Sequence, residues 1–127
     1  MAERTLANPT IEVNNGVIGI KPNSLTFKSG KGDKKVRPQS AGGNSVEMVI
    51  TEDAETKKGM VKFTLYNTKT NVDLLTAWQD SVEGNTVRFS DGEFVRSFRT
   101  MTVTSDPDIS LGADGEFEAV FEGQPAG

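Results

Sequence analysis

Cysteine and histidine are both absent from this chain of 127 residues. Without cysteine the protein has no disulfide and no thiol nucleophile, and without either residue it lacks the usual zinc ligands. The absence of histidine also removes the side chain that most often serves as a general base near neutral pH. We therefore expect no enzyme, and no catalytic residue, cofactor site or metal site.

Long apolar runs and an excess of positive charge are also missing. No apolar stretch approaches the ~20 residues that span a membrane, and residues 1–8 lack the apolar centre of a secretory signal. The formal net charge of −4 argues against the clustered basic surface that grips nucleic acid. A chain of this length is expected to form one domain, residues 1–127, with a substantial hydrophobic core.

Alternation of apolar and polar residues is what the chain does contain. In the last third, residues 98–103 and 115–122 alternate on either side of an acidic turn at 106–108. Phe117, Ala119 and Phe121 would point to one side of a strand, and Glu116, Glu118, Val120 and Glu122 to the other. A period of two predicts strands with one buried face and one charged face.

The same pattern predicts antiparallel strands along most of the chain. A short hairpin is expected around Asn14-Asn15-Gly16, because both central positions of an Asn-Gly turn tolerate positive φ. Residues 46–51 and 60–66 alternate strictly and are predicted to pair as a second hairpin. Further strands are expected at 25–28, 86–89 and 94–104.

Residues 29–43 interrupt this pattern. Glycines there are interleaved with lysines, and no apolar period is present. The segment is interpreted as a long, mobile loop or hairpin tip, which in a small domain is usually functional or disordered. The C-terminal residues 123–127 are expected to be frayed.

One amphipathic helix is predicted among the strands. Thr70 or Asn71 can cap its first turn by accepting a free backbone amide, and Asp73 lies where the helix dipole favours an anion. Gly84 is the predicted stop. The apolar stripe at helical spacing, which either packs on the core or forms an exposed partner site, consists of Leu74, Leu75, Trp78 and Val82.

Three patterns suggest chemistry and fail on closer inspection. The acidic residues from Asp106 onward do not match an EF-hand loop, since its sixth and twelfth positions would be Leu111 and Phe117. Glu116 and Glu118 lie about 7 Å apart on one strand face, as in a glycosidase pair, but no aromatic sugar platform accompanies them. The glycine- and lysine-rich stretch 30–35 lacks the GxxxxGK[ST] pattern of a phosphate loop.

In the order of its elements the chain resembles a tail tube protein of a contractile-tailed bacteriophage. The resemblance extends roughly from Gly43 to Pro125 and is structural in kind. It is carried by the stretches "SVEMVITEDAETKKGMVKFTLYNT", "TNVDLLTAWQD" and "RTMTVTSDPDISLGADGEFEAVFEGQP". Residues before Gly43 match less distinctively.

This resemblance implies a mainly β fold, an antiparallel β-sandwich or small barrel with one flanking α-helix and a long loop, shared with pyocin and type VI secretion tubes. In that family six subunits form a ring, and their inner sheets join into one barrel around a channel. The hexameric rings stack into the inner tail tube, through which the genome is ejected into the host cell. The chain is then expected to be a structural protein of the virion, assembled in the host cytoplasm.

The resemblance also implies partners and places residues. The partners are further copies of the chain, the contractile tail sheath protein, the baseplate or tail initiator, and the terminator and tape-measure proteins, while DNA passes through the lumen without specific binding. The helix would lie outside, with Asp73 and Asp80 toward the sheath. The residues expected to face the lumen, where carboxylates repel phosphates, are Glu47, Thr100, Thr102, Thr104, Glu116 and Glu118. The basic residues that match the loop reaching a neighbouring ring, and its acidic turns near Asp91 or Asp106, are Lys31, Lys34, Lys35 and Arg37.

Three alternatives remain open at this stage. A monomeric β-sandwich binding module would fit the strands and predicts an exposed apolar or aromatic patch. A small enzyme would have to work through Glu116 and Glu118 alone. A tube from a genome-free contractile particle has almost the same sequence chemistry as a phage tube.

Overall fold

A computed structural model describes residues 9–40, 42–91 and 94–127 of the chain. The described part is mainly β and antiparallel, with a single α-helix. The predicted fold class, mainly β with one helix, is therefore confirmed. Its elements are β1 (Thr10–Val13), β2 (Gly16–Ile18), β3 (Thr26–Lys28), β4 (Lys34–Ser40), β5 (Val46–Glu52), the 3-10 helix η1 (Ala54–Thr56), β6 (Gly59–Tyr66), α1 (Lys69–Asp80), β7 (Asn85–Ser90), β8 (Val95–Val103) and β9 (Glu116–Gly123).

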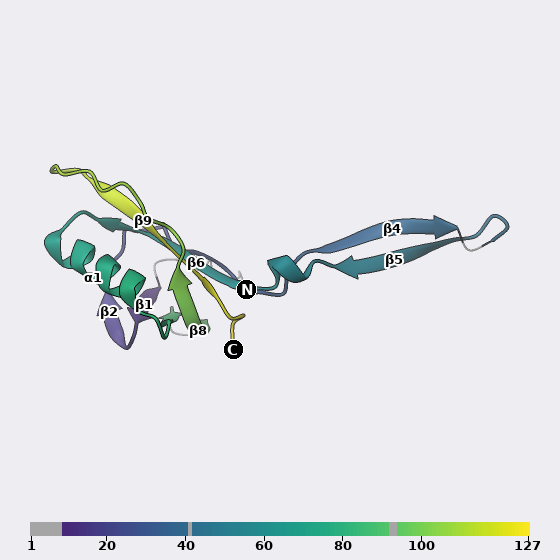
Figure 1. Cartoon of the computed structure of the whole chain (residues 1–127), viewed down its shortest axis with the longest axis horizontal. Helices are drawn as coiled ribbons and strands as arrows, with labels where there is room; N and C mark the ends of the chain where they lie inside the picture. Colours follow the sequence, from purple (N-terminus) through teal and green to yellow (C-terminus); the bar gives the residue numbers. More distant parts are fainter. Residues whose placement is uncertain (1–8, 41, 92–93) are drawn as a thin grey trace, which may run out of the picture.

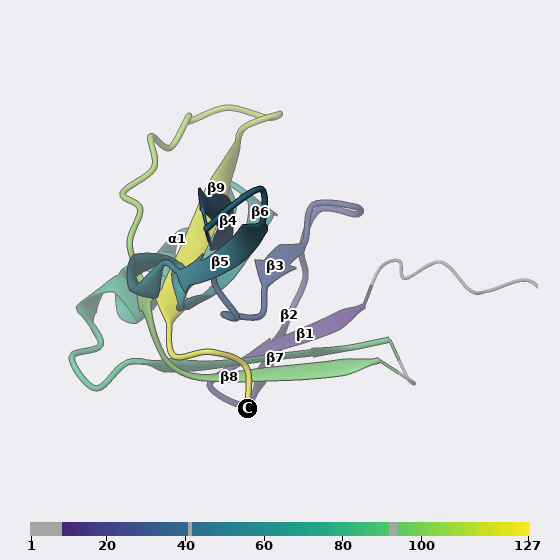
Figure 2. The same ribbon diagram turned by 90° about the vertical axis from the view of Figure 1, so that its right-hand side faces the viewer.

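The strands form one large sheet and one separate hairpin. Seven of them are ordered β2-β1-β7-β8-β9-β6-β3, and β4 pairs only with β5. The large sheet folds over itself, so that β6, β9 and β3 cross above β1, β7 and β8 (Figure 2). Its end strands β2 and β3 do not pair, and the predicted small barrel is therefore not closed.

The hydrophobic core fills the space inside the folded sheet. As the alternation predicted, Phe117, Ala119 and Phe121 of β9 are buried, while Glu116 and Glu118 are exposed. Inward-facing residues of the opposite layer complete the core with Ile11, Val13, Val87, Phe89, Phe98 and Met101. Burying each large apolar side chain contributes about 1.5–3 kcal/mol. The core cluster contains no residue of β4 or β5.

Strand β6 does not pair with β5, so the hairpin predicted between residues 46–51 and 60–66 is wrong. β6 instead pairs with β9 along its whole length and with β3 at Met60–Lys62. The alternation of β6 and β5 looks alike in the sequence, but only Val61, Phe63 and Leu65 of β6 reach the core. Alternation reports that a strand has two faces and does not report its partner.

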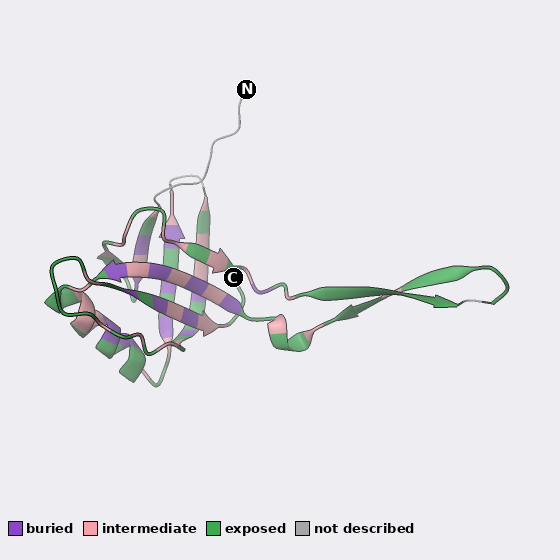
Figure 3. Cartoon of the chain, turned by 90° about the horizontal axis from the view of Figure 1, so that it is seen from above, coloured by how far each residue is buried: buried purple, intermediate pink, exposed green. Residues whose placement is uncertain are grey.

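The segment 29–43, predicted as a long loop or hairpin tip, contains a strand and leads into the tip of a hairpin. Residues Lys34–Ser40 form β4, which pairs with all of β5 from Lys34 opposite Glu52 to Ser40 opposite Val46. β4 is held by its pairing with β5, so the absence of a clear apolar period was misleading. We call residues 34–52 the arm. It projects from the body at the end opposite α1 (Figure 1), and nearly all of its residues are exposed (Figure 3).

The first hairpin is confirmed. Val13 pairs with Gly16 across a two-residue turn, Asn14-Asn15. Both asparagines have positive φ, 52° and 68°, as a type I′ turn requires.

The predicted helix exists with shifted ends. Its N-cap is Thr68, whose Oγ1 accepts a hydrogen bond from the Asn71 amide at 3.2 Å, rather than Thr70 or Asn71. Leu75 and Trp78 are buried, and the Trp78 ring lies 5.4 Å from that of Phe121. Val82 falls beyond the helix and is 99% exposed. The predicted stripe therefore packs on the core, apart from Val82.

The C-terminal residues are held in place rather than frayed. The Ala126 amide donates to the Ser29 carbonyl at 2.8 Å, and the Gly127 amide donates to the Ser97 carbonyl at 3.1 Å. Pro125 covers Gly30, where an added Cβ would lie 2.7 Å from the proline Cβ. The chain end thus braces the segment that leads into the arm.

Replacing Asn85 with leucine should lower the free energy of unfolding by about 2–4 kcal/mol. The buried Asn85 Nδ2 donates to the carbonyls of Trp78 and Met101 at 3.1 and 3.2 Å, and its Oδ1 accepts from Asn14 at 2.9 Å. Leucine leaves these groups unpaired. Urea denaturation measures the loss. Gln39→Leu, which removes an exposed amide on β4, is the control, and an equal loss in both variants would contradict this role of Asn85.

Candidate functional site

The arm has one apolar face and one polar face. In its register Val36 lies opposite Ile50, Pro38 opposite Met48, and Ser40 opposite Val46, so these residues share a face. The other face consists of Lys35, Arg37, Gln39, Glu47, Val49 and Thr51. The apolar face therefore forms a continuous stripe along the hairpin.

This stripe is exposed to solvent. Val36, Val46, Met48 and Ile50 keep 61%, 60%, 65% and 65% of their surface exposed. An isolated two-stranded hairpin is marginally stable in water, and contiguous exposed apolar surface of this kind marks an interaction site. None of the stripe residues belongs to the hydrophobic core of the described body or packs against it. Contact with an apolar surface of another molecule would stabilise it.

The root of the arm is fixed to the body by a polar network. The Asp33 amide donates to Thr56 Oγ1 at 2.7 Å, and the Asp53 amide donates to the Asp33 carbonyl at 2.9 Å. Thr56 Oγ1 in turn donates to the Asp53 carbonyl at 2.9 Å. The short helix η1 thus clamps both strands where they leave the body, so that the arm's direction is defined near its base.

The four predicted basic residues do not share a surface. Lys34 lies 4.0 Å from Glu52 on the apolar side of the arm, at its root. Lys35 and Arg37 occupy the polar face. Lys31 lines a depression at the root together with Lys28 and Lys58. Their contact with a neighbouring ring stays a prediction.

The residues predicted to face a lumen are only partly brought together. Glu116 and Glu118 lie opposite Tyr66 and Thr64 on the outer face of the sheet. Thr102 lies opposite Glu122 on the same face, and the Thr104 amide continues this pairing by donating to the Val120 carbonyl at 3.0 Å. Thr100 has a positive φ of 54° at an irregularity of β8, and Glu47 lies on the arm.

This outer face, made by β3, β6 and the β9 half of the sheet, is mixed in charge rather than uniformly acidic. Lys62 and Lys28 lie on it beside the glutamates. Glu116 accepts a hydrogen bond from Lys21 at 3.0 Å. Glu122 pairs with Lys58 at 3.1 Å. The face is polar, but because lysines offset its glutamates, it would repel phosphate less than a face carrying the glutamates alone.

The two aspartates expected on the outside are exposed on α1. Asp73 pairs with Lys69 at 2.8 Å, one helical turn away, and Asp80 ends the helix. α1 and the arm lie at opposite ends of the molecule (Figure 1). Nothing in the sequence singled out the apolar stripe of the arm as functional. The pattern that could have indicated it is the alternate spacing of Val36 and Pro38, which is matched by Met48 and Ile50 on the other side of Gly42-Gly43.

No protein-family model matches the chain, and no curated protein is significantly similar to it in sequence. No helix in the described ranges is long and apolar enough to cross a membrane. Within these ranges no three His, Cys, Asp or Glu side chains converge as metal ligands. The exposed apolar stripe of the arm and the polar face of β6 and β9 are the candidate functional surfaces.

The variant Lys57→Gln should raise the pKa of Glu52 toward its ordinary value. The hydrogen bond from Lys57 lowers the pKa of this carboxyl, and the charges of Lys57 and Lys34 add to the effect. Because the folded pKa is lowered, the small stabilisation from this exposed pair is present at neutral pH and is lost as pH falls through the lowered pKa. NMR titration of the side-chain carboxyl carbon measures the change. Lys35→Gln, on the other face, should leave it unaltered, and a pKa unmoved in Lys57→Gln would contradict the pairing.

Proposed function

We propose that the protein is the structural subunit of a contractile-tail inner tube, in which hexameric rings stack around a channel for genome ejection. The observation that carries the proposal is the arm, a braced hairpin whose apolar stripe has no place in the subunit's own core. Such a surface is typical of a chain that completes itself by contact with another copy. The order of elements, which resembles tail tube proteins, supplies the kind of assembly.

Within this assembly the other surfaces have consistent positions. The polar outer face carrying Glu116, Glu118 and Thr102 would line the lumen. Lys21 and Lys58 are paired with Glu116 and Glu122, which reduces the number of cations that could hold DNA as it slides. The open ends of the sheet at β2 and β3 would allow neighbouring sheets to adjoin around a ring.

The partners follow from the same arrangement. α1, with exposed Asp73 and Asp80, would face the contractile sheath, while the arm reaches a neighbouring subunit. Baseplate or initiator, terminator and tape-measure proteins would start, end and measure the tube. The protein would then be a virion component without enzymatic activity or cofactor, assembled in the host cytoplasm.

The second candidate is a monomeric β-sandwich binding module, whose exposed apolar patch would be the same stripe on the arm. The two candidates differ in what covers the stripe, a copy of the chain or a foreign partner. A tube from a genome-free contractile particle would use the same surfaces as a phage tube and differs in its neighbouring genes.

Negative-stain electron microscopy with light-scattering mass tests the proposal. Hollow six-fold rings or tubes are expected from the purified protein, alone or with a tail initiator complex. The double variant Met48→Lys/Ile50→Lys places two charges in the apolar stripe and should abolish assembly, since a buried contact cannot accommodate unpaired charges.

The matched control is Gln39→Lys/Thr51→Lys, which adds the same charge to the polar face of the same hairpin. It should assemble much more completely than the stripe variant. A strict monomer at high concentration, even with an initiator complex present, would refute the tube and favour the binding module.

A further inference from the structure

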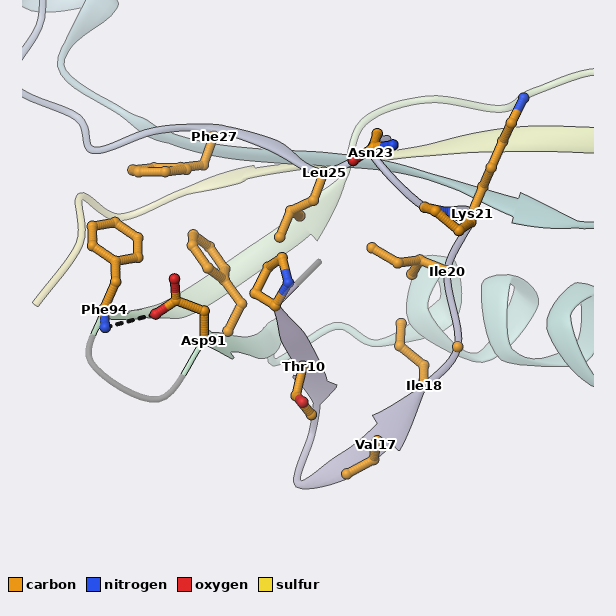
Figure 4. Close-up of a pocket in the computed structure, with 14 residues that line it drawn as sticks. Thr10, Val17, Ile18, Ile20, Lys21, Asn23, Leu25, Phe27, Asp91 and Phe94 are labelled. Carbon is orange, nitrogen blue, oxygen red and sulfur yellow. Dashed lines mark hydrogen bonds between the residues drawn. The ribbon is translucent and has the colours of Figure 1, made fainter. Parts of the chain in front are cut away.

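A groove of about 510 Å³ lies where the folded sheet fails to close, beside its end strands β2 and β3. Figure 4 shows Ile18, Ile20 and Leu25 projecting into it, with Phe27 and Phe94 at one end. These five side chains are only partly buried, although they pack against the core. The groove is therefore an opening into the apolar interior.

The lining is apolar with polar residues at its margin. Phe89 forms part of its floor, and the Phe27 ring lies 5.0 Å from the Phe89 ring and 5.8 Å from the Phe94 ring. The Phe94 amide donates to Asp91 Oδ1 at 2.8 Å at the edge. Lys21 lines the other margin and is directed toward Glu116. A molecule bound in the groove would thus need an apolar surface toward its interior.

We infer that this groove receives the apolar stripe of the arm from a second copy of the chain. The inference rests on the self-assembly proposed above and specifies its contact. The arm carries the complementary chemistry, a narrow row of aliphatic side chains built around Val36, Met48 and Ile50. Seven-residue strands make the arm about 23 Å long, which is enough to reach beyond its own subunit.

The distribution of charge favours the same pairing. The arm has a formal charge of +1, from Lys34, Lys35 and Arg37 against Glu47 and Glu52. Since the whole chain has a net charge of −4, the rest of the chain carries −5. Opposite net charges attract an arm to the body of another copy and disfavour contact between two arms. Burial of the stripe would then supply the short-range stabilisation.

An arm that enters a groove makes a head-to-tail contact. Each copy donates one arm and offers one groove, so the contact can join successive copies into a ring or a filament. A contact between two apolar stripes would instead be two-fold symmetric and would end at a dimer. The receiving surface therefore determines whether the arm can build an extended assembly.

Cysteine cross-linking tests the contact directly, because the chain has no native cysteine. Two single variants, Met48→Cys on the stripe and Leu25→Cys in the groove, are mixed and oxidised. A disulfide forms only where the two Cβ atoms approach to about 4 Å. The expected result is a product at twice the chain mass on a non-reducing gel that appears in the mixture and not when either variant is oxidised alone. Ile18→Cys replaces Leu25→Cys if the latter lowers the melting temperature.

The matched control pairs Leu25→Cys with Thr51→Cys, on the polar face of the arm, and should give little product. A product formed by Met48→Cys with itself would assign the stripe to an arm–arm contact and overturn the inference. Tubes seen by microscopy without a Met48–Leu25 cross-link would also overturn it while leaving the proposed function intact. A Met48–Leu25 cross-link in protein that forms no tubes would support the contact between arm and groove and refute the proposed tube.

Discussion

Packing inside the folded sheet is the constraint on which the rest of the structure depends. Aromatic residues from both layers, Phe63 and Phe121 above and Phe89 and Phe98 below, fill this space with Trp78 of α1. Each strand of the large sheet presents alternate side chains to it, and their register follows from that requirement. β4 and β5 contribute nothing to it. The chain therefore divides into a body that satisfies its own apolar surface and an arm that does not.

That division leaves two apolar surfaces outside the filled core. The arm offers an apolar stripe, and the unclosed end of the sheet offers an apolar groove. The bracing of the arm by η1, Pro125 and Ala126 keeps its base rigid, so that less conformational entropy is lost when the stripe is covered. Between these two surfaces, the polar face of β6 and β9 remains available to water or to a polymer moving past it.

The sequence predicted the parts of the fold whose signals are local. Alternation located β6 and β9 and their buried faces, Asn14-Asn15 identified the first hairpin, and Leu75 and Trp78 identified the buried side of the helix. Strand partners were not predictable in the same way, because β5 and β6 alternate equally well. The arm was missed because β4 has only two apolar positions, Val36 and Pro38, and its backbone pairing with β5 is not recorded in the spacing of its residues. The groove was missed because it arises from the approach of β2 and β3, which no local spacing encodes.

Amide hydrogen exchange of the arm, measured in dilute and in concentrated protein, addresses most directly whether another copy covers the stripe. An uncovered hairpin exchanges fast, since it opens at little free-energy cost. Coverage by a second copy should slow exchange of residues 34–40 and 46–52 selectively at high concentration, with β6 and β9 unchanged. Equal, fast exchange of the arm at both concentrations, in protein that forms no assemblies, would contradict a self-assembling subunit.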